Sequence, residues 1–93
     1  MSLVFEWDPK KAASNLARRR TSFNEAAEAF YDPLSATVED TTSTGGMRFI
    51  LIGQTPKRKI LLVVYIERGE RIRIISARDA TKQEVRIYEE GNE

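Results

Sequence analysis

The 93-residue sequence contains no cysteine and no histidine. Without cysteine there can be no disulfide bond, thiolate nucleophile or zinc–thiolate site. Without histidine the chain lacks the usual general base at neutral pH and the commonest ligand of transition metals. Carboxylates can still bind a metal ion, but no clustered carboxylate motif is present. We therefore expect no metal and no cofactor, and any catalysis must use Arg, Lys, Asp, Glu, Tyr, Ser or Thr.

Long apolar runs are also absent. The longest, residues 60–66, has the length of a strand and is too short to span a membrane. The N-terminus lacks the charged and apolar regions of a signal peptide. A composition of 41% hydrophobic and 31% charged residues is typical of globular proteins. We expect one domain over residues 1–93, located in the cytoplasm and not in a membrane.

Positive charge is concentrated in one part of the chain. The net charge is +1, but residues 1–47 carry −2, residues 48–78 carry +6 and residues 79–93 carry −3. Such a concentration is typical of an anion-binding surface. Alternatively, these charges are solvated positions at strand edges and in loops, where they discourage edge pairing.

The apolar spacing and the turn signals predict an α+β fold with the order β-α-α-β-β-β-β-α. Strands are expected near residues 3–7, 34–39, 48–53, 60–66 and 71–77, and residues 41–46 are expected to form a turn. Two N-terminal helices and one C-terminal helix are expected, with starts at Asp8-Pro9, Ser22-Phe23-Asn24-Glu25 and Thr81-Lys82-Gln83-Glu84. The short connections predict an antiparallel meander of the last three strands within a mostly antiparallel, four- to five-stranded sheet. Residues 60–66 are apolar throughout, which predicts a strand covered on both faces.

Arginines are the residues best suited to chemistry. Arg73 lies between two isoleucines on a predicted strand, and a rigidly held guanidinium matches the geometry of phosphate. Arg78 follows at the junction to the last helix, and Arg68 lies in the preceding turn. Because their separation is odd, Arg73 and Arg78 face opposite sides of a regular strand. Either the strand ends or twists before Arg78, or the two do not share a site.

Simpler structural roles remain open for the same residues. Arg73 can pair with a neighbouring carboxylate, Arg78 can pair with the final helix, and Arg68 can be a plain turn charge. Trp7, the only tryptophan, suits either the core or a platform on which a base stacks.

Several separate motifs resemble the BrnT family of toxins. They are Phe5-Glu6-Trp7-Asp8-Pro9-Lys10-Lys11-Ala12, Asn15, Ser22-Phe23-Asn24-Glu25-Ala26, Phe30, Asp32-Pro33, Arg48, Ile52-Gly53, residues 64–70, residues 72–78, Glu84 and Tyr88. The similarity extends over about residues 5–90. The family typically reads Lys-His-Gly-Val-Ser-Phe where this chain has residues 18–23, so Arg19 replaces the His. Arginine binds phosphate, but its high pKa makes it a poor base.

The resemblance implies a bacterial type II toxin with a RelE-like fold, which cuts RNA with basic residues instead of a metal ion. It also implies a partner, a BrnA-type antitoxin with a ribbon-helix-helix DNA-binding part. The toxin would contact operator DNA only through this antitoxin. Metal-free RNA cleavage requires deprotonation of the 2′-hydroxyl, stabilisation of the phosphorane and protonation of the leaving oxygen. The expected catalytic residues are Arg73, Arg78, Arg48 and Glu67, and the expected RNA-binding residues are Arg68, Trp7, Arg19, Lys57 and Lys59. The base would be Glu67 or a lysine, either Lys57 or Lys59.

Two other functions remain open. A homologue that lacks the histidine can bind its antitoxin or RNA without cleaving anything. A protein–protein module without any nucleic-acid role is compatible with the near-zero net charge.

Overall fold

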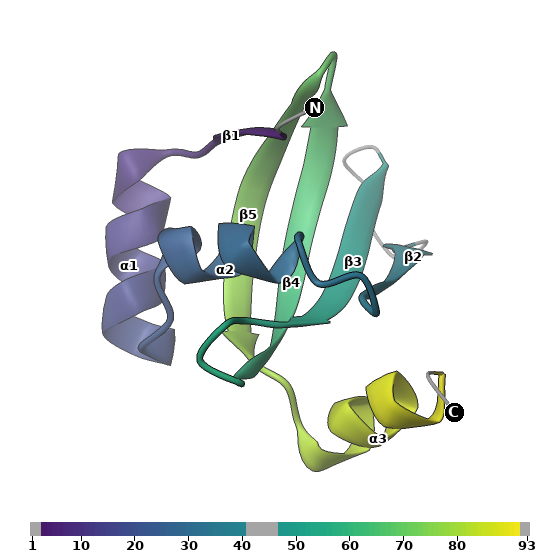
Figure 1. Ribbon diagram of the computed structural model, residues 1–93. Helices are drawn as coiled ribbons and strands as arrows, with labels where there is room; N and C mark the ends of the chain where they lie inside the picture. The colour runs from purple at the N-terminus through teal and green to yellow at the C-terminus, as the bar shows by residue number, and fades with distance from the viewer. Residues whose placement is uncertain (1–2, 41–46, 92–93) are drawn as a thin grey trace.

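The structure, a computed structural model, describes residues 3–40 and 47–91, so the turn expected over 41–46 lies outside the described residues. The elements are β1 (Val4–Glu6), α1 (Pro9–Arg19), α2 (Phe23–Ala29), β2 (Ala36–Asp40), β3 (Arg48–Gln54), β4 (Ile60–Arg68), β5 (Arg71–Asp79) and α3 (Lys82–Glu90) (Figure 1). This α+β architecture has the element order that the sequence predicts.

The five strands form one mixed sheet in the order β1-β5-β4-β3-β2. The pairs β2–β3, β3–β4 and β4–β5 are antiparallel, and the last two form the predicted meander. β1, in contrast, pairs in parallel with the upper part of β5, with Val4 opposite Arg71. The sequence did not predict this parallel edge, because a three-residue strand that pairs with a distant segment leaves no local pattern.

Side chains at the helix starts account for the helix boundaries. Asp8 caps α1, and its carboxylate accepts a hydrogen bond from the first turn. Both predicted capping boxes form, with Ser22 and Glu25 at the start of α2 and Thr81 and Glu84 at the start of α3. These bonds satisfy amides that have no partner within the helix, which stabilises each start by about 1 kcal/mol.

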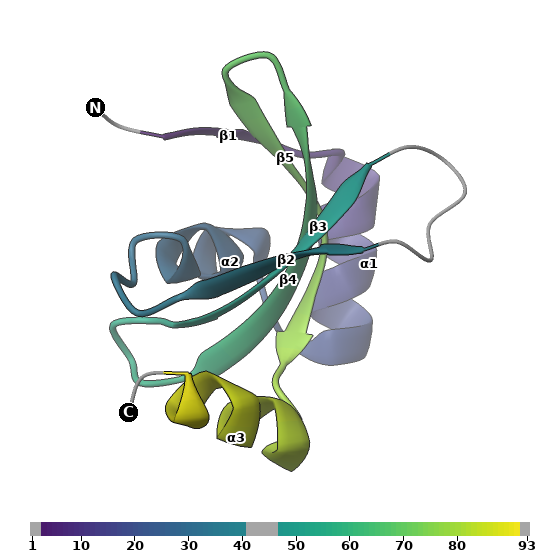
Figure 2. The ribbon, with the colours of Figure 1, turned by 90° about the vertical axis from the view of Figure 1, so that its right-hand side faces the viewer.

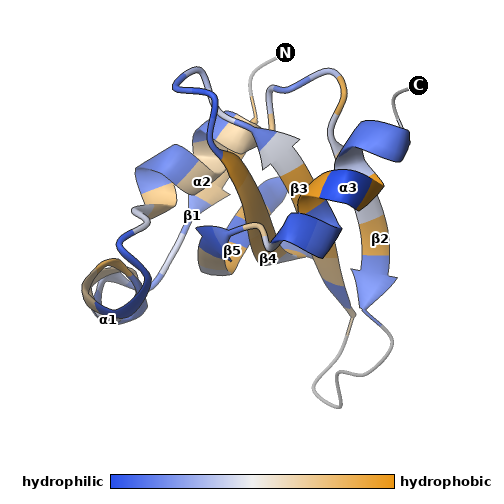
Figure 3. Ribbon diagram, turned by 90° about the horizontal axis from the view of Figure 1, so that it is seen from below, coloured by the Kyte–Doolittle hydropathy of each residue, from blue (hydrophilic) through white to orange (hydrophobic). Residues whose placement is uncertain are grey.

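α2 covers one face of the sheet, and the core lies between the two (Figures 1 and 2). The buried residues of its largest cluster are Phe23, Ala26, Leu61, Val63, Ile74 and Ala77. Figure 3 shows hydrophobic residues concentrated in the central strands and hydrophilic residues on the helix surfaces and at the turns. Within the described residues, none of the helices is long and apolar enough to cross a membrane.

The opposite face of the sheet has no helix packed across its middle. We call this the open face; it carries the outward side chains of β3, β4 and β5. The expectation that β4 is covered on both faces is correct only for the first part of the strand. On the open face Leu62 is buried, but Val64 and Ile66 are only half-buried. α1 stands beside β5 and extends to the side of the sheet away from α2, while α3 lies beyond the lower ends of the strands (Figures 1 and 2). The open face is therefore bordered by two helix termini.

Candidate functional site

A β-bulge interrupts the regular alternation of β5. The consecutive residues Val64 and Tyr65 of β4 pair with Ser76 and Ile74, so Ile75 has no partner on β4. An extra residue of this kind shifts the in–out pattern of the strand by one position. The two halves of β5 therefore present their side chains in opposite phase.

The shift places Arg73 and Arg78 on the same face, although their odd separation predicts opposite faces. On the helix side, Ile74 and Ala77 both belong to the core although they are three residues apart, which agrees with the shift. β5 does not end before Arg78 but runs to Asp79. The β4 partners of the two arginines are four residues apart, which corresponds to roughly 14 Å along the strand.

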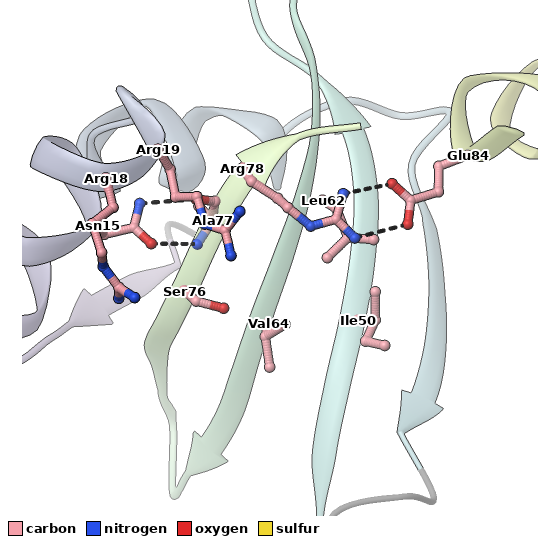
Figure 4. Close-up of a pocket in the computed structure, with 10 residues that line it drawn as sticks. All are labelled: Asn15, Arg18, Arg19, Ile50, Leu62, Val64, Ser76, Ala77, Arg78 and Glu84. Carbon is pink, nitrogen blue, oxygen red and sulfur yellow. Dashed lines mark hydrogen bonds and ion pairs between the residues drawn. The ribbon is translucent and has the colours of Figure 1, made fainter. Parts of the chain in front are cut away.

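A hollow of about 320 Å³ lies on the open face between α1, β5 and the start of α3 (Figure 4). Arg18 and Arg19 of α1 and Arg78 of β5 line it together with the hydroxyl-bearing Ser76. Its floor is formed by apolar side chains of β3 and β4, among them Val64. Three guanidinium groups thus gather around a partly apolar concavity, an arrangement that suits a phosphate with an organic group attached.

Arg78 is held by a carboxylate of α3. Its Nη1 and Nη2 donate to Oε1 and Oε2 of Glu84 at 2.8 and 2.9 Å. Glu84 also accepts a 2.8 Å bond from the backbone amide of Thr81, because it completes the capping box of α3. The bonds from Arg78, opposed by burial and aided by the Thr81 amide, lower the pKa of Glu84 to about 2. The simpler role considered for Arg78, an ion pair with the final helix, is confirmed, and a phosphate must compete with Glu84 for it.

Asn15 fixes α1 against the edge of β5. Its side chain is buried, and its amide group donates to the carbonyl of Ala77 at 2.8 Å while its oxygen accepts from the Ala77 amide at 3.2 Å. A third bond, at 2.9 Å, runs to a carbonyl of the α1–α2 connection. These bonds to β5 lie below the segment that β1 pairs with. They set the position of Arg18 and Arg19 relative to the neighbouring Arg78.

Arg18 and Arg19 lie in the last turn of α1 and are exposed. Cations at this end of a helix complement its dipole. Within the described part of the chain neither of them forms an ion pair. They are therefore the cations of the hollow that are available to an anionic ligand, and this placement is compatible with the expected phosphate-binding role of Arg19.

A second group of arginines gathers higher on the open face, around Glu6 of β1. Nη1 of Arg73 donates to Oε2 of Glu6 at 2.9 Å, and Nη1 of Arg68 lies 3.5 Å from the same oxygen. Nη1 of Arg71 lies 3.7 Å from Oε1. The bond from Arg73, opposed by burial and aided by the charges of the other two, lowers the pKa of Glu6. We call these four residues the Glu6 cluster.

The cluster confirms one expectation and corrects another. Arg73 is paired with a carboxylate, as one of its possible roles required. Arg68 was expected in the turn after this strand, but it is the last residue of β4 and pairs with Arg71. The turn between β4 and β5 is therefore shorter than expected. Gly69 of that turn has a φ of 62°, which glycine adopts without strain.

The structure places two of the three expected base candidates, Glu67 and Lys59, away from the open face. Glu67 pairs with Ile72, which packs against the core on the helix side, so Glu67 faces away from the hollow. Lys59 bonds through Nζ to Glu25 of α2 at 3.1 Å, which also places it on the helix side. Lys57 is exposed in the β3–β4 connection. The alternation of β4 thus separates Glu67 from the arginines that it was expected to assist.

Trp7 and Arg48 are also separated from the hollow. Trp7 packs edge-on against Phe23, with ring centroids 5.9 Å apart, and belongs to the core on the helix side. This packing agrees with the core role, and it places the half-buried indole away from the arginines of the hollow. Arg48 begins β3 and shares the open face with Ile50 by strand alternation. It does not line the hollow among the described residues.

Sequence reasoning did not predict Arg18, Ser76 or Glu6 as site residues. Arg18, Arg19 and Arg20 are consecutive in the sequence, so this run of basic residues at the end of α1 was a usable signal. Ser76 gave none, because its direction depends on the bulge. Glu6 gave none either, because it meets the arginines only through the parallel pairing of β1.

Comparison with known proteins adds independent information. Residues 7–84 match a protein family described as the ribonuclease toxin, BrnT, of type II toxin-antitoxin systems. Among solved structures, the chain is similar to the ribonuclease toxin BrnT of Brucella abortus, with a TM-score of 0.64 and 20% sequence identity. That similarity covers 87% of this chain and 100% of the other, and at this identity it shows a shared fold alone. A search of curated proteins gave no match.

Proposed function

The chain belongs to the BrnT family of ribonuclease toxins of type II toxin–antitoxin systems, and from this premise we propose that it cleaves RNA in the hollow between α1, β5 and α3. The observation that carries the proposal is the convergence of Arg18, Arg19 and Arg78 on one concavity. A scissile phosphate bound there meets Arg18 and Arg19, which form no ion pair with any described residue. It also meets the rigidly held guanidinium of Arg78, for which it competes with Glu84. Fixed donors of this kind stabilise the charge that develops on a phosphorane, and removal of one such donor typically costs about 3 kcal/mol of barrier.

We propose that this cleavage needs no metal ion. Of the described residues that line the hollow, Glu84 is the one carboxylate. Its oxygens already accept bonds from Arg78 and Thr81, which makes it a poor ligand for a divalent cation. The described residues also contain no group of three or more acidic, histidine or cysteine side chains that could hold a metal. Guanidinium groups would then supply the positive charge at the reacting phosphate.

A second candidate function is a homologue that binds RNA or its antitoxin without cleaving. The lining of the hollow favours it, because a carboxylate with a pKa near 2 is a weak base at neutral pH. Arg19, which stands where the family typically has histidine, is no better as a base. Binding therefore depends only on groups present in the hollow, whereas cleavage also needs a proton acceptor.

We further propose a BrnA-type ribbon-helix-helix antitoxin as the partner, with contact to operator DNA made only through it, in the cytoplasm. The open face supports a protein partner, since it combines basic residues with exposed or half-buried apolar side chains such as Val38 and Val64. Induced expression of the chain should arrest growth, and co-expression of the neighbouring antitoxin should restore it. Growth that continues without the antitoxin would contradict the toxin role.

Cleavage of RNA by the purified chain in the presence of EDTA tests the proposed site. We expect the wild type to cleave, and Arg78→Ala to lower the rate on the order of 100-fold. Arg86→Ala is the matched control, because Arg86 is an exposed arginine of α3 outside the hollow. Undiminished cleavage by Arg78→Ala would refute the site. If the wild type binds RNA but does not cleave it, the second candidate function replaces the first.

A further inference from the structure

The Glu6 cluster keeps most of its hydrogen-bond donors available. Arg73 alone lies within hydrogen-bonding distance of Glu6, whereas Arg68 and Arg71 are held near it at 3.5 and 3.7 Å. The side chains of Arg68 and Arg71 are 59% and 65% exposed. Three guanidinium groups around one carboxylate leave a local charge of +2. The carboxylate thus offsets part of their mutual repulsion without occupying their donors.

The cluster shares the open face with the hollow. The strand positions of Arg73 and Arg78 are roughly 14 Å apart along β5, and the bulge directs both outward. Between them lie Ser76 and the half-buried Val64 and Ile66. A polyanion that leaves the hollow along β4 and β5 therefore crosses a partly apolar strip and then meets a second group of cations.

We infer that the Glu6 cluster is a second phosphate-binding subsite, which holds the backbone of single-stranded RNA away from the reacting phosphate. This inference rests on the proposed function. Arginine forks match phosphate geometry, and an apolar strip between two cationic groups suits the faces of intervening bases. In this arrangement Glu6 is a positioning residue, since it holds Arg73 directly and the other two arginines by charge.

Binding of RNA that cannot be cleaved tests the subsite independently of catalysis. The probes are 2′-O-methyl RNAs, one a dinucleotide and the other about ten nucleotides long, a length within the range that such surfaces bind. For Arg71→Ala we expect affinity for the long RNA to fall about tenfold more than affinity for the dinucleotide. The slope of log affinity against log salt should also fall by about 0.7 for the long RNA, because one phosphate contact is lost. Arg86→Ala removes one positive charge outside the cluster and serves as the control. It should lower the affinity for both RNAs by the same small factor and leave the salt slope nearly unchanged.

Two outcomes would overturn the inference. In the first, Arg71→Ala lowers the affinity for the dinucleotide and for the long RNA by the same factor, or changes neither affinity. In the second, the variant binds RNA normally but loses affinity for the antitoxin, which would assign the cluster to an acidic segment of the partner protein. If the wild type cleaves RNA and either of these outcomes is found, the proposed subsite is refuted and the proposed function stands. Absence of cleavage combined with the expected length dependence removes the catalytic proposal and keeps the subsite.

Substitutions of Glu6 separate positioning from simple charge. Both Glu6→Gln and Glu6→Ala remove the negative charge, but only glutamine keeps an oxygen that can accept the bond from Arg73. We expect Glu6→Gln to bind the long RNA at least as tightly as the wild type, and Glu6→Ala to bind several-fold more weakly than Glu6→Gln. Equal affinities of the two variants, with unchanged thermal unfolding, would refute the positioning role.

Discussion

Replacing Glu84 with glutamine tests the clamp that joins α3 to β5. The carboxylate receives two bonds from Arg78, and its pKa falls from 4.5 to about 2. A difference of this size corresponds to at most roughly 3.4 kcal/mol of folding free energy. The side chains of Arg78 and Glu84 are 33% and 20% exposed, so solvent screens the pair. We therefore expect Glu84→Gln to lower the free energy of unfolding by about 1–2 kcal/mol at pH 7.

The stability contribution of Glu84 should depend on pH in a definite direction. The pKa of Glu84 is lower in the folded state than in the unfolded state, so the contribution is complete above about pH 4.5 and is lost as the pH falls towards 2. The stability difference between wild type and Glu84→Gln should therefore shrink between pH 5 and pH 2.5. Urea unfolding, monitored by the fluorescence of Trp7, measures this stability difference, since the indole packs against the core. Glu89→Gln, at an exposed position of the same helix, is the control.

The same variant should strengthen RNA binding, because Arg78 no longer has a charged competitor for the phosphate. Stability and RNA affinity thus change in opposite directions. A stability difference that does not vary with pH would refute the role of the Glu84 carboxylate. Weaker RNA binding by Glu84→Gln would refute the competition and indicate that Glu84 contacts the substrate itself.

Three further substitutions test the supports of the fold, each by thermal and urea unfolding. Asn15→Ala should lower the free energy of unfolding by about 2–4 kcal/mol, because it removes three hydrogen bonds and leaves backbone groups of β5 unpaired. Tyr88→Phe should cost about 1–2 kcal/mol, because the hydroxyl donates a 2.5 Å bond to the carboxylate of Asp32. Gly53→Ala should cost about 1–3 kcal/mol, because the new methyl group would lie 2.6 Å from the carbonyl oxygen of Ala29.

Each of these three variants has a matched control. Ser14→Ala changes an exposed neighbour on α1, and Tyr31→Phe removes the hydroxyl of a tyrosine that is 58% exposed. Gly91→Ala adds a methyl group whose nearest neighbour atom is 3.3 Å away. All three controls should lie within about 0.5 kcal/mol of the wild type. A test variant that is as stable as its control would show that the contact in question contributes little.

Features encoded by nearby residues could be predicted from the sequence. The start of α1 at Asp8 and the capping boxes that begin at Ser22 and Thr81 appear where the sequence places them. The meander of β3, β4 and β5 follows from short turns between β-forming segments. In each case the signal lies within a few residues of the structure that it specifies.

Features that depend on distant contacts could not be predicted. The bulge at Ile75 arises from the way β5 fits β4 and the core, and alternation applied to β5 alone gave the wrong relation between Arg73 and Arg78. The pairing of β1 with β5 brings Glu6 to Arg73 across 67 residues of sequence. The position of Glu67, one of the three base candidates, could not be predicted for the same reason, since the register of β4 and β5 directs its side chain to the helix side. Arg73 and Arg78, and the kind of group that pairs with each, could therefore be predicted from the sequence, but the identity of Glu6 as the partner of Arg73 could not.

The contact between Asn15 and Ala77 also determines which sheet edges another chain can extend. An unpaired stretch of strand backbone is a template for strand addition by a partner or by a second copy. Below β1, the amide of Asn15 occupies the N–H and C=O of Ala77, so that part of β5 is closed to an incoming strand. Among the described strands, β2 and the short β1 form the two edges of the sheet. A partner that adds a strand to this sheet should therefore approach at β2 or at the short β1, and not at the part of β5 that Asn15 contacts.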